Sequence, residues 1–321
     1  MTFSDQFVPP VMVCRQNRGV TTSRVSPGGA MLGKRYCPVS WPALLMLLVL
    51  TTPVMAYDDP LMAHMDVAVG YDNNVGNAGF SAGRRDDAFA EAGLRINRLW
   101  LAGVFVSLEL EAGLRSRQYQ DYHRLSHVSP DFQGRLNYRP AGGFFMPTVT
   151  GWGGVTYLGY GSDIREGSVT RAGLSLRQPL TTHLTLWASA TDARRRADND
   201  VFSYGFHTLG LQLGWQPVSA LTAFAGYSRR EGDFVSTNVE NADIQQAARA
   251  WLADDAFGAD DDDYVAYRLN APSERLVLGL EYALSGAWAL TAQGEYIDTS
   301  AYRISYQRSI LRFGLSRSFP W

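Results

Sequence analysis

Apolar and polar residues alternate with a period of two through most of the chain beyond residue 57. This is the period of a β-strand that has one apolar and one polar face. The clearest case is 275–284, where every even-numbered residue is a leucine or a tyrosine. A second case, 104–114, places Val, Leu and Ala on one face and Ser, Glu and Gly on the other. The pattern predicts an all-β fold.

Twelve segments follow this pattern, and many have ten or more residues. Soluble strands average about five or six residues, whereas strands of membrane barrels have about 9–11. The lengths favour a barrel whose apolar face meets lipid over a soluble sandwich that packs the same face inward. The expected strands lie within 63–72, 87–98, 102–118, 124–139, 145–161, 167–178, 184–195, 201–216, 221–231, 266–284, 288–298 and 304–321.

The connections between these segments alternate in character. Short turns with Pro or Gly, such as 139–143 and 178–182, alternate with longer polar links, such as 73–86 and 232–265. Bacterial outer-membrane barrels have an even strand count, short periplasmic turns and longer outer loops. We therefore predict a transmembrane antiparallel up-and-down β-barrel of about 12 strands, in the range 10–14.

The first 56 residues have the pattern of a targeting segment. Lys34 and Arg35 precede the apolar run 43–50, and Val54-Met55-Ala56 follows with small or apolar residues at the cleavage positions. We predict a signal peptide over 31–56, with a retained anchor as the alternative. Residues 1–30 are expected to be a non-translated or disordered extension. The single outer-membrane β-barrel domain is expected to span 57–321.

Splitting the chain at residue 56 changes the composition. The only lysine and both cysteines precede that point, so the barrel segment carries arginine as its only strong base and has no thiol chemistry. It is net acidic, which argues against nucleic-acid binding.

The last strand carries a family-level signal. The segment 311–321 is similar to the terminal strand of Gram-negative outer-membrane proteins, in which an aromatic residue ends the chain and apolar residues alternate before it. Arg317 departs from that pattern. The resemblance implies recognition by the barrel-assembly machinery through Leu311, Phe313, Leu315, Phe319 and Trp321. The segment 70–75 resembles the opening strand of surface-lipoprotein-assembly-modifier barrels, which usually carry a helical-repeat domain ahead of the barrel.

Placing the apolar faces outward assigns a set of charged residues to the interior of the barrel. These could form ladders of arginine and carboxylate that rigidify the wall, or a selectivity path that biases permeation. The predicted lumen-lining set is Asp66, Glu91, Arg95, Glu109, Glu111, Arg115, Arg171, Arg177, Arg275, Glu281, Glu295, Arg308 and Arg312.

The link 232–265 is the largest outer loop. It contains 242–252, which we predict to be a short helix. An acidic group follows, which reads either as a solvated extracellular loop or as a divalent-cation site: Asp254, Asp255, Asp260, Asp261, Asp262 and Asp263.

Three functions remain open. The first is a porin-like channel for small polar solutes, and the second is a closed structural or interaction barrel that serves export or surface assembly. The third, a lipid-modifying enzyme, would use His127, Ser129 and Asp131, but residues two apart on a strand lie about 6–7 Å apart and project in parallel. We expect no enzyme activity, no cofactor and no metal. The expected partners are outer-membrane lipid, lipopolysaccharide and a small polar solute.

Overall fold

The computed structural model describes residues 61–257, 264–301 and 304–320, which belong to the compact unit Tyr57–Trp321. The predicted signal peptide and the extension before it lie outside the described residues. The same is true of Trp321 and of Asp260, Asp261, Asp262 and Asp263.

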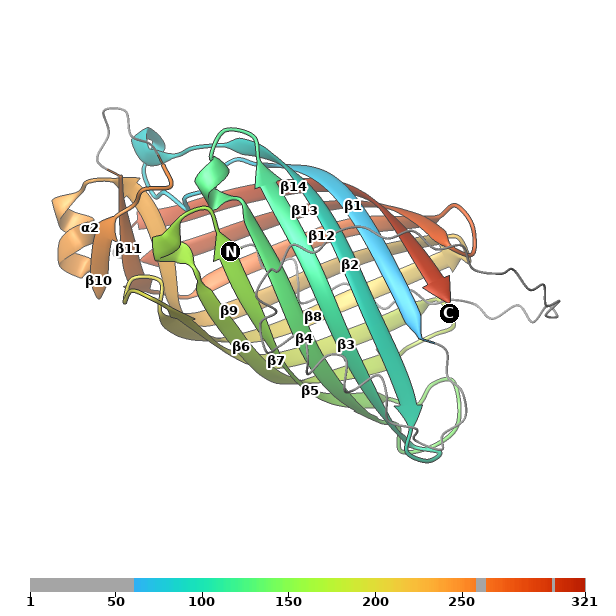
Figure 1. The fold of residues 1–321 in the computed structure, drawn as a ribbon. Coiled ribbons are helices and arrows are strands. Elements are labelled where there is room, and N and C mark those ends of the chain that lie inside the picture. The colour runs from blue at the N-terminus through green and yellow to red at the C-terminus, as the bar shows by residue number, and fades with distance from the viewer. Residues whose placement is uncertain (1–60, 258–263, 302–303, 321) are drawn as a thin grey trace, which may run out of the picture. The chain divides into compact units, whose positions relative to one another are not determined.

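Twelve antiparallel strands form a closed barrel (Figure 1). Each strand pairs with its neighbours in sequence, except that β9 pairs with β12, and the pairing of β1 with β14 completes the circle. The prediction of a 12-strand up-and-down barrel is therefore confirmed. The barrel strands are β1 (Met62–Asp72), β2 (Asp87–Leu101), β3 (Val106–Tyr119), β4 (His127–Tyr138), β5 (Thr148–Tyr160), β6 (Gly167–Pro179), β7 (Leu184–Ala197), β8 (Tyr204–Val218), β9 (Leu221–Val239), β12 (Ser273–Ala283), β13 (Trp288–Ala301) and β14 (Ile304–Pro320).

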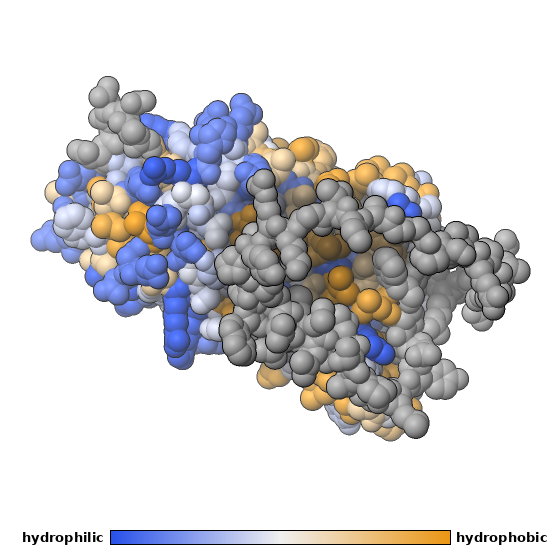
Figure 2. Space-filling view, viewed as in Figure 1, coloured by the Kyte–Doolittle hydropathy of each residue, from blue (hydrophilic) through white to orange (hydrophobic). Residues whose placement is uncertain are grey.

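The outer surface of the barrel is apolar over a continuous band. Leu209 and Leu278 are 67% and 66% exposed, values that a water-soluble fold would not place on most of its strands. Figure 2 shows hydrophobic residues over the body of the barrel and hydrophilic residues at the loop end. Exposed aromatic residues lie toward both ends of the band, for example Tyr71 and Tyr157 at the loop end and Trp215 at the turn end. This arrangement suits a lipid bilayer with aromatic girdles at its two interfaces.

Glycines on the inner face receive aromatic rings from the neighbouring strand. Gly279 of β12 lies opposite Phe224 of β9, and a Cβ built on Gly279 would lie 2.1 Å from the Phe224 ring. Gly70 of β1 and Phe89 of β2 form a second such pair, in which a Cβ built on Gly70 would lie 2.3 Å from the Phe89 ring. The rings cover strand positions that have no side chain, so each pair fixes the register locally.

Two predicted elements differ from the structure. The predicted strand 266–284 is divided into β11 (Tyr264–Asn270) and β12, because Pro272 between them lacks the N–H that a continuous ladder needs. The predicted helix 242–252 ends early. The helix α2 covers only Ala242–Ala247, and 250–253 instead forms the strand β10 (Ala250–Ala253) by pairing with β11.

β9 extends beyond the barrel and begins a separate small sheet at the loop end. It pairs with β8 as far as Gly232, whose φ is +132°, and from Asp233 onward it pairs with β11. We call the described residues 233–257 and 264–271 the outer cap; they contain the end of β9, α2, β10 and β11. Among the described residues, no helix has the length and apolar character needed to cross a membrane.

Candidate functional site

The structure places every predicted lumen-lining residue on the face opposite the exposed apolar side chains. All of them are buried or partly buried, and they alternate along their strands with exposed residues such as Leu94 and Leu174.

Several of these charges form ion pairs within one side of the wall. Glu91 accepts from Arg117 and forms an ion pair with Arg312, whose Nε lies 2.7 Å from Oε2. Arg275 Nη2 lies 2.9 Å from Glu295 Oε1, and both side chains are buried. These pairs match the ladder interpretation for β1–β3 and β12–β14.

A second group lies toward the turn end of the barrel. Arg135 Nη1 bridges Glu109 at 3.1 Å and Glu111 at 3.3 Å. Asn97 Nδ2 donates to the same Glu109 carboxylate at 3.0 Å. The Arg135 side chain points inward, yet it is 30% exposed. Water therefore reaches this part of the inner face.

Three predicted interior arginines have no carboxylate within 4.0 Å among the residues described: Arg95, Arg171 and Arg177. Arg171 Nη1 donates to Thr156 Oγ1 at 3.3 Å. The interior carboxylate Glu281 likewise has no ion pair in the described part of the chain. The ladder interpretation thus accounts for some of the predicted set and leaves these four residues outside it.

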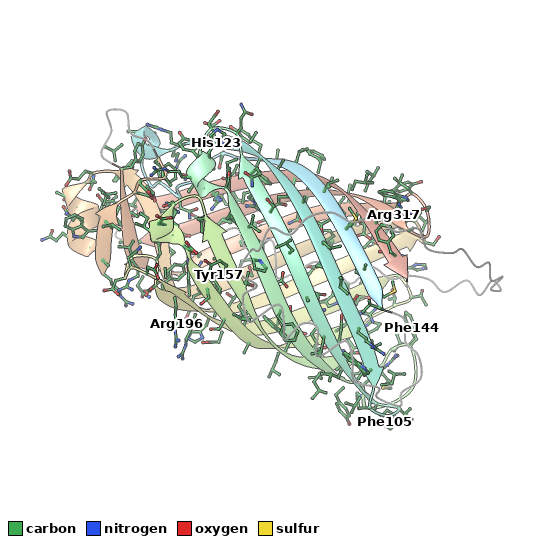
Figure 3. All side chains as sticks on the ribbon, viewed as in Figure 1. Phe105, His123, Phe144, Tyr157, Arg196 and Arg317 are labelled. Atoms are coloured by element: carbon green, nitrogen blue, oxygen red, sulfur yellow. The ribbon has the colours of Figure 1, made fainter. Side chains whose placement is uncertain are left out.

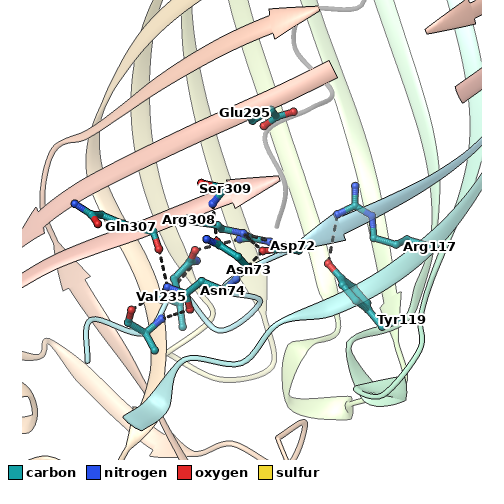
Figure 4. A network of polar contacts seen from close by, with 12 residues as sticks. Asp72, Asn73, Asn74, Arg117, Tyr119, Val235, Glu295, Gln307, Arg308 and Ser309 are labelled. Carbon is teal, nitrogen blue, oxygen red and sulfur yellow. Dashed lines mark hydrogen bonds and ion pairs between the residues drawn. The ribbon is translucent and has the colours of Figure 1, made fainter. Parts of the chain in front are cut away.

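A buried polar network joins the first outer link to the last strand (Figure 4). Arg308 Nε lies 3.0 Å from both carboxylate oxygens of Asp72, and its Nη1 donates to Asn77 Oδ1 at 3.1 Å. Asn74 Nδ2 donates to the carbonyl of Gln307 at 2.8 Å. Because Asp72 and Asn74 are fully buried, the segment 73–86 begins as a packed link rather than a free loop.

The predicted acidic loop begins with two carboxylates that have contrasting roles. Asp254 is fully buried and pairs with Arg165, whose Nε lies 3.2 Å from Oδ1. It also accepts from the Thr237 hydroxyl at 2.6 Å. Asp255 is 40% exposed and pairs with Arg124 at 2.6 Å. Asp254 is therefore part of a buried network, contrary to the expectation of a solvated loop.

The outer cap contacts the links that follow β1, β3, β5 and β7. Thr237 N donates to Gly76 O at 2.7 Å in the β1–β2 link. Asp255 pairs with Arg124 of the β3–β4 link, and Asp254 pairs with Arg165 of the β5–β6 link. Arg268 Nη1 donates to Asp200 O at 2.7 Å in the β7–β8 link. Contacts with links on opposite sides of the barrel show that the cap spans its outer mouth.

Apolar packing reinforces these contacts. Phe257 and Tyr264 of the cap share a buried cluster with Phe89 and Tyr119, which point inward from β2 and β3. Tyr267 is completely buried, and its hydroxyl accepts from Asn241 N at 2.9 Å. Burial raises the pKa of the Tyr267 hydroxyl, so the neutral form is favoured.

The C-terminal residues of the predicted assembly signal point outward. Leu311 and Phe313 are 52% and 59% exposed, and Leu315 and Phe319 are partly buried on the same face. Arg317, which departs from the family pattern, lies at the turn end of the barrel (Figure 3). Its guanidinium carbon is 5.0 Å from the Trp288 ring and 4.4 Å from the Phe319 ring. Its charge therefore rests on aromatic faces.

The residues considered for catalysis do not converge. His127 Nδ1 contacts Leu125 O at 3.1 Å, and the Ser129 hydroxyl donates to Arg115 O at 3.4 Å. Neither side chain hydrogen-bonds to the other in the structure. The described residues contain no group of three or more His, Cys, Asp or Glu side chains arranged to hold a metal ion.

The predicted interior set omitted several charged residues that share its face. Arg117, Asp131 and Arg135 continue the odd-numbered inner face of β3 and β4, so the same alternation would have found them. Arg165 and Asp254 lie in links without periodicity, and only the folded chain brings them together.

These features define a class. A closed antiparallel barrel of even strand number, apolar outside and polar inside, is the fold of Gram-negative outer-membrane β-barrel proteins. The chain is similar to the NanC porin, with 14% identity, a TM-score of 0.44 and coverage of 79% of this chain and 98% of that one. It is similar to the KdgM porin in complex with disordered oligogalacturonate, with 12% identity, a TM-score of 0.41 and coverage of 80% and 99%.

A third similar structure is an outer-membrane channel from Pseudomonas putida F1. It has 14% identity and a TM-score of 0.49, with coverage of 84% of this chain and 100% of that chain. No family model matches the sequence, and no curated protein matches it.

Proposed function

We propose that this protein is a porin-like channel of the outer membrane for small polar solutes. The carrying observation is that polar side chains occur on the inner face along the whole length of the barrel. Charged or hydrogen-bonding side chains line it from Asp72 near the cap, through Arg171, to Glu109 near the turns. A barrel that served only as a packed wall could fill this space with apolar side chains, without the cost of burying charge.

The width of the barrel supports the same proposal. A barrel of 12 strands lies between eight-strand barrels that are filled by side chains and porins of 16 or more strands with an open channel. A bore of this size suits one small solute at a time. The outer cap, which spans the mouth, would then restrict entry.

A liposome-swelling assay tests the proposal. Protein purified from outer membranes is reconstituted into vesicles, and the entry of neutral sugars of increasing size is followed by light scattering. We expect entry of the smallest sugars and a steep fall with size. Vesicles that contain heat-denatured protein are the control.

The cap favours a second candidate, a closed interaction barrel. Its network with four links would keep the mouth shut in that case. If no sugar enters, even in a variant with the cap loosened by Asp254→Asn, the channel proposal is wrong and the closed barrel is favoured.

A further inference from the structure

The two halves of the inner face carry different charge. Along β5–β9, as far as Gly232, the inward positions carry four arginines, Arg171, Arg177, Arg195 and Arg230, and no carboxylate. The inward carboxylates of the barrel strands lie on the other half, from β12 through β14 to β4. We call the inward face of β5–β9 the basic wall.

Two of the four arginines are fixed in the packing beneath the cap. Arg195 stacks on Phe202 at 5.5 Å and donates to Arg165 O. Arg230 stacks on Phe206 at 3.7 Å and donates to Asp233 O. Their guanidinium groups are therefore occupied by contacts at the loop end of the barrel.

Arg171 and Arg177 are placed differently. Both lie on β6 below the cap, and in the described part of the chain neither has a carboxylate within 4.0 Å. Arg177 lies between Thr148 on β5 and Trp187 on β7. Arg177 lies six positions after Arg171, roughly 20 Å away along the strand. They form two cationic stations at different depths on one wall.

Most carboxylates of the other half are already paired. Its carboxylates Glu91, Glu109 and Glu295 are each held by an arginine of the same half. Glu281 faces inward without an ion pair among the described residues. Asp131 also has no ion pair there, and it lies at the border of the basic wall, opposite Thr156, the residue that accepts from Arg171. The positive charge of the basic wall below the cap therefore comes from β6, and Arg95 of β2 adds a cation on the other half.

The rest of the basic wall can hydrogen-bond to uncharged polar groups. Its other inward residues include hydroxyls, for example Thr150, Ser175 and Thr191, and the indole rings of Trp152 and Trp187. We propose, resting on the proposed channel function, that the basic wall is the path of small hydroxylated oxyanions. Arg171 and Arg177 are successive binding stations that hold the oxyanion by charge-assisted hydrogen bonds and pass it along.

Ion selectivity is the first test. The reversal potential of protein purified from outer membranes is measured in planar bilayers under a tenfold KCl gradient, and we expect it to show preference for chloride. The double variant Arg171→Gln/Arg177→Gln should lower the anion-to-cation permeability ratio at least about threefold. Asp131→Asn should raise that ratio. The control Arg194→Gln removes an exposed charge from the outer surface and should change nothing.

Cation preference, or a double variant that behaves as the wild type, would overturn the inference while leaving the channel function intact. The absence of any current would instead contradict the channel function.

A second measurement does not depend on conductance. Saturation-transfer NMR with the solubilised protein compares gluconate, acetate and sorbitol. We expect the strongest transfer to gluconate, weaker transfer to acetate and a loss of both in Arg171→Gln/Arg177→Gln. Equal transfer to gluconate and acetate would contradict the claim that the hydroxyl groups of the solute contribute to binding. Sorbitol binding that equals gluconate binding would contradict the oxyanion class.

Discussion

Among single residues, the two adjacent aspartates Asp254 and Asp255 lie in opposite environments, one buried and one exposed. Asp254 is enclosed beside Arg165 and Thr237, whereas Asp255 reaches Arg124 at the surface. A buried pair that loses one partner leaves an uncompensated charge, while an exposed pair contributes little. Identical side chains one position apart should therefore differ widely in energetic importance.

Asp254→Asn should destabilise the outer cap by about 3 kcal/mol or more, because Arg165 would remain buried without its carboxylate. Asp255→Asn should cost about 1 kcal/mol or less. Hydrogen exchange of the β11 amides measures the difference. Equal exchange rates in the two variants would contradict the assignment of the buried network.

Gly279→Ala should destabilise the barrel by about 1–3 kcal/mol, because the added methyl group would overlap the Phe224 ring. The free energy of unfolding in vesicles, followed in urea, gives the value. Gly286→Ala is the matched control, since a Cβ there meets nothing within 4 Å. Recovery of stability in Gly279→Ala/Phe224→Leu would identify the ring as the cause; no recovery would point to the backbone instead.

Residue orientation was predictable and residue pairing was not. The alternation of apolar and polar residues predicts which face of its strand Arg275 or Glu295 occupies. In the structure both lie on the inner face. Their ion pair depends on the register between β12 and β13, which no single strand encodes. Arg165 and Asp254 lie outside any alternating segment, so their pairing needs the folded loops.

At the scale of elements, β9 joins the barrel to the cap. It is the longest strand, and it changes partners at Gly232, where the backbone is in a region that favours glycine. A Cβ at Gly232 would lie 2.6 Å from the Gly205 carbonyl oxygen. Both the conformation and the close approach therefore require glycine there.

Gly232→Ala should loosen the junction by about 2 kcal/mol or more, combining backbone strain with the clash against β8. Limited proteolysis of the cap in intact vesicles measures the effect, and faster cleavage is expected. Gly103→Ala has a comparable φ of +135° but meets nothing within 4 Å, so it isolates the strain. A cap equally resistant in wild type and Gly232→Ala would contradict this role.

Most barrel strands were predictable from alternation, because one face of each must be apolar for its whole length. The cap was not, since β11 is buried on both faces and has no alternating pattern to detect. The boundary between β11 and β12 does have a local signal, because Pro272 lacks the N–H that a continuous strand would need there.

At the scale of the whole barrel unit, the apolar band sets the environment. Leu278 lies within the band, whereas Val104 lies in a turn at the end of β2 and is 90% exposed. Leu278→Arg should destabilise the protein in a bilayer by about 2–4 kcal/mol, and Val104→Arg by about 1 kcal/mol or less. Unfolding in phosphatidylcholine vesicles measures both. Equal costs would contradict the membrane-spanning orientation.

The single-channel current of the purified protein in a planar bilayer tests the channel function most directly. If the polar inner face forms a solute path, discrete conductance steps should occur, and they should become larger or more frequent in Asp254→Asn as the cap loosens. No steps at any voltage, in the wild type or in that variant, would contradict the channel function and favour a closed barrel.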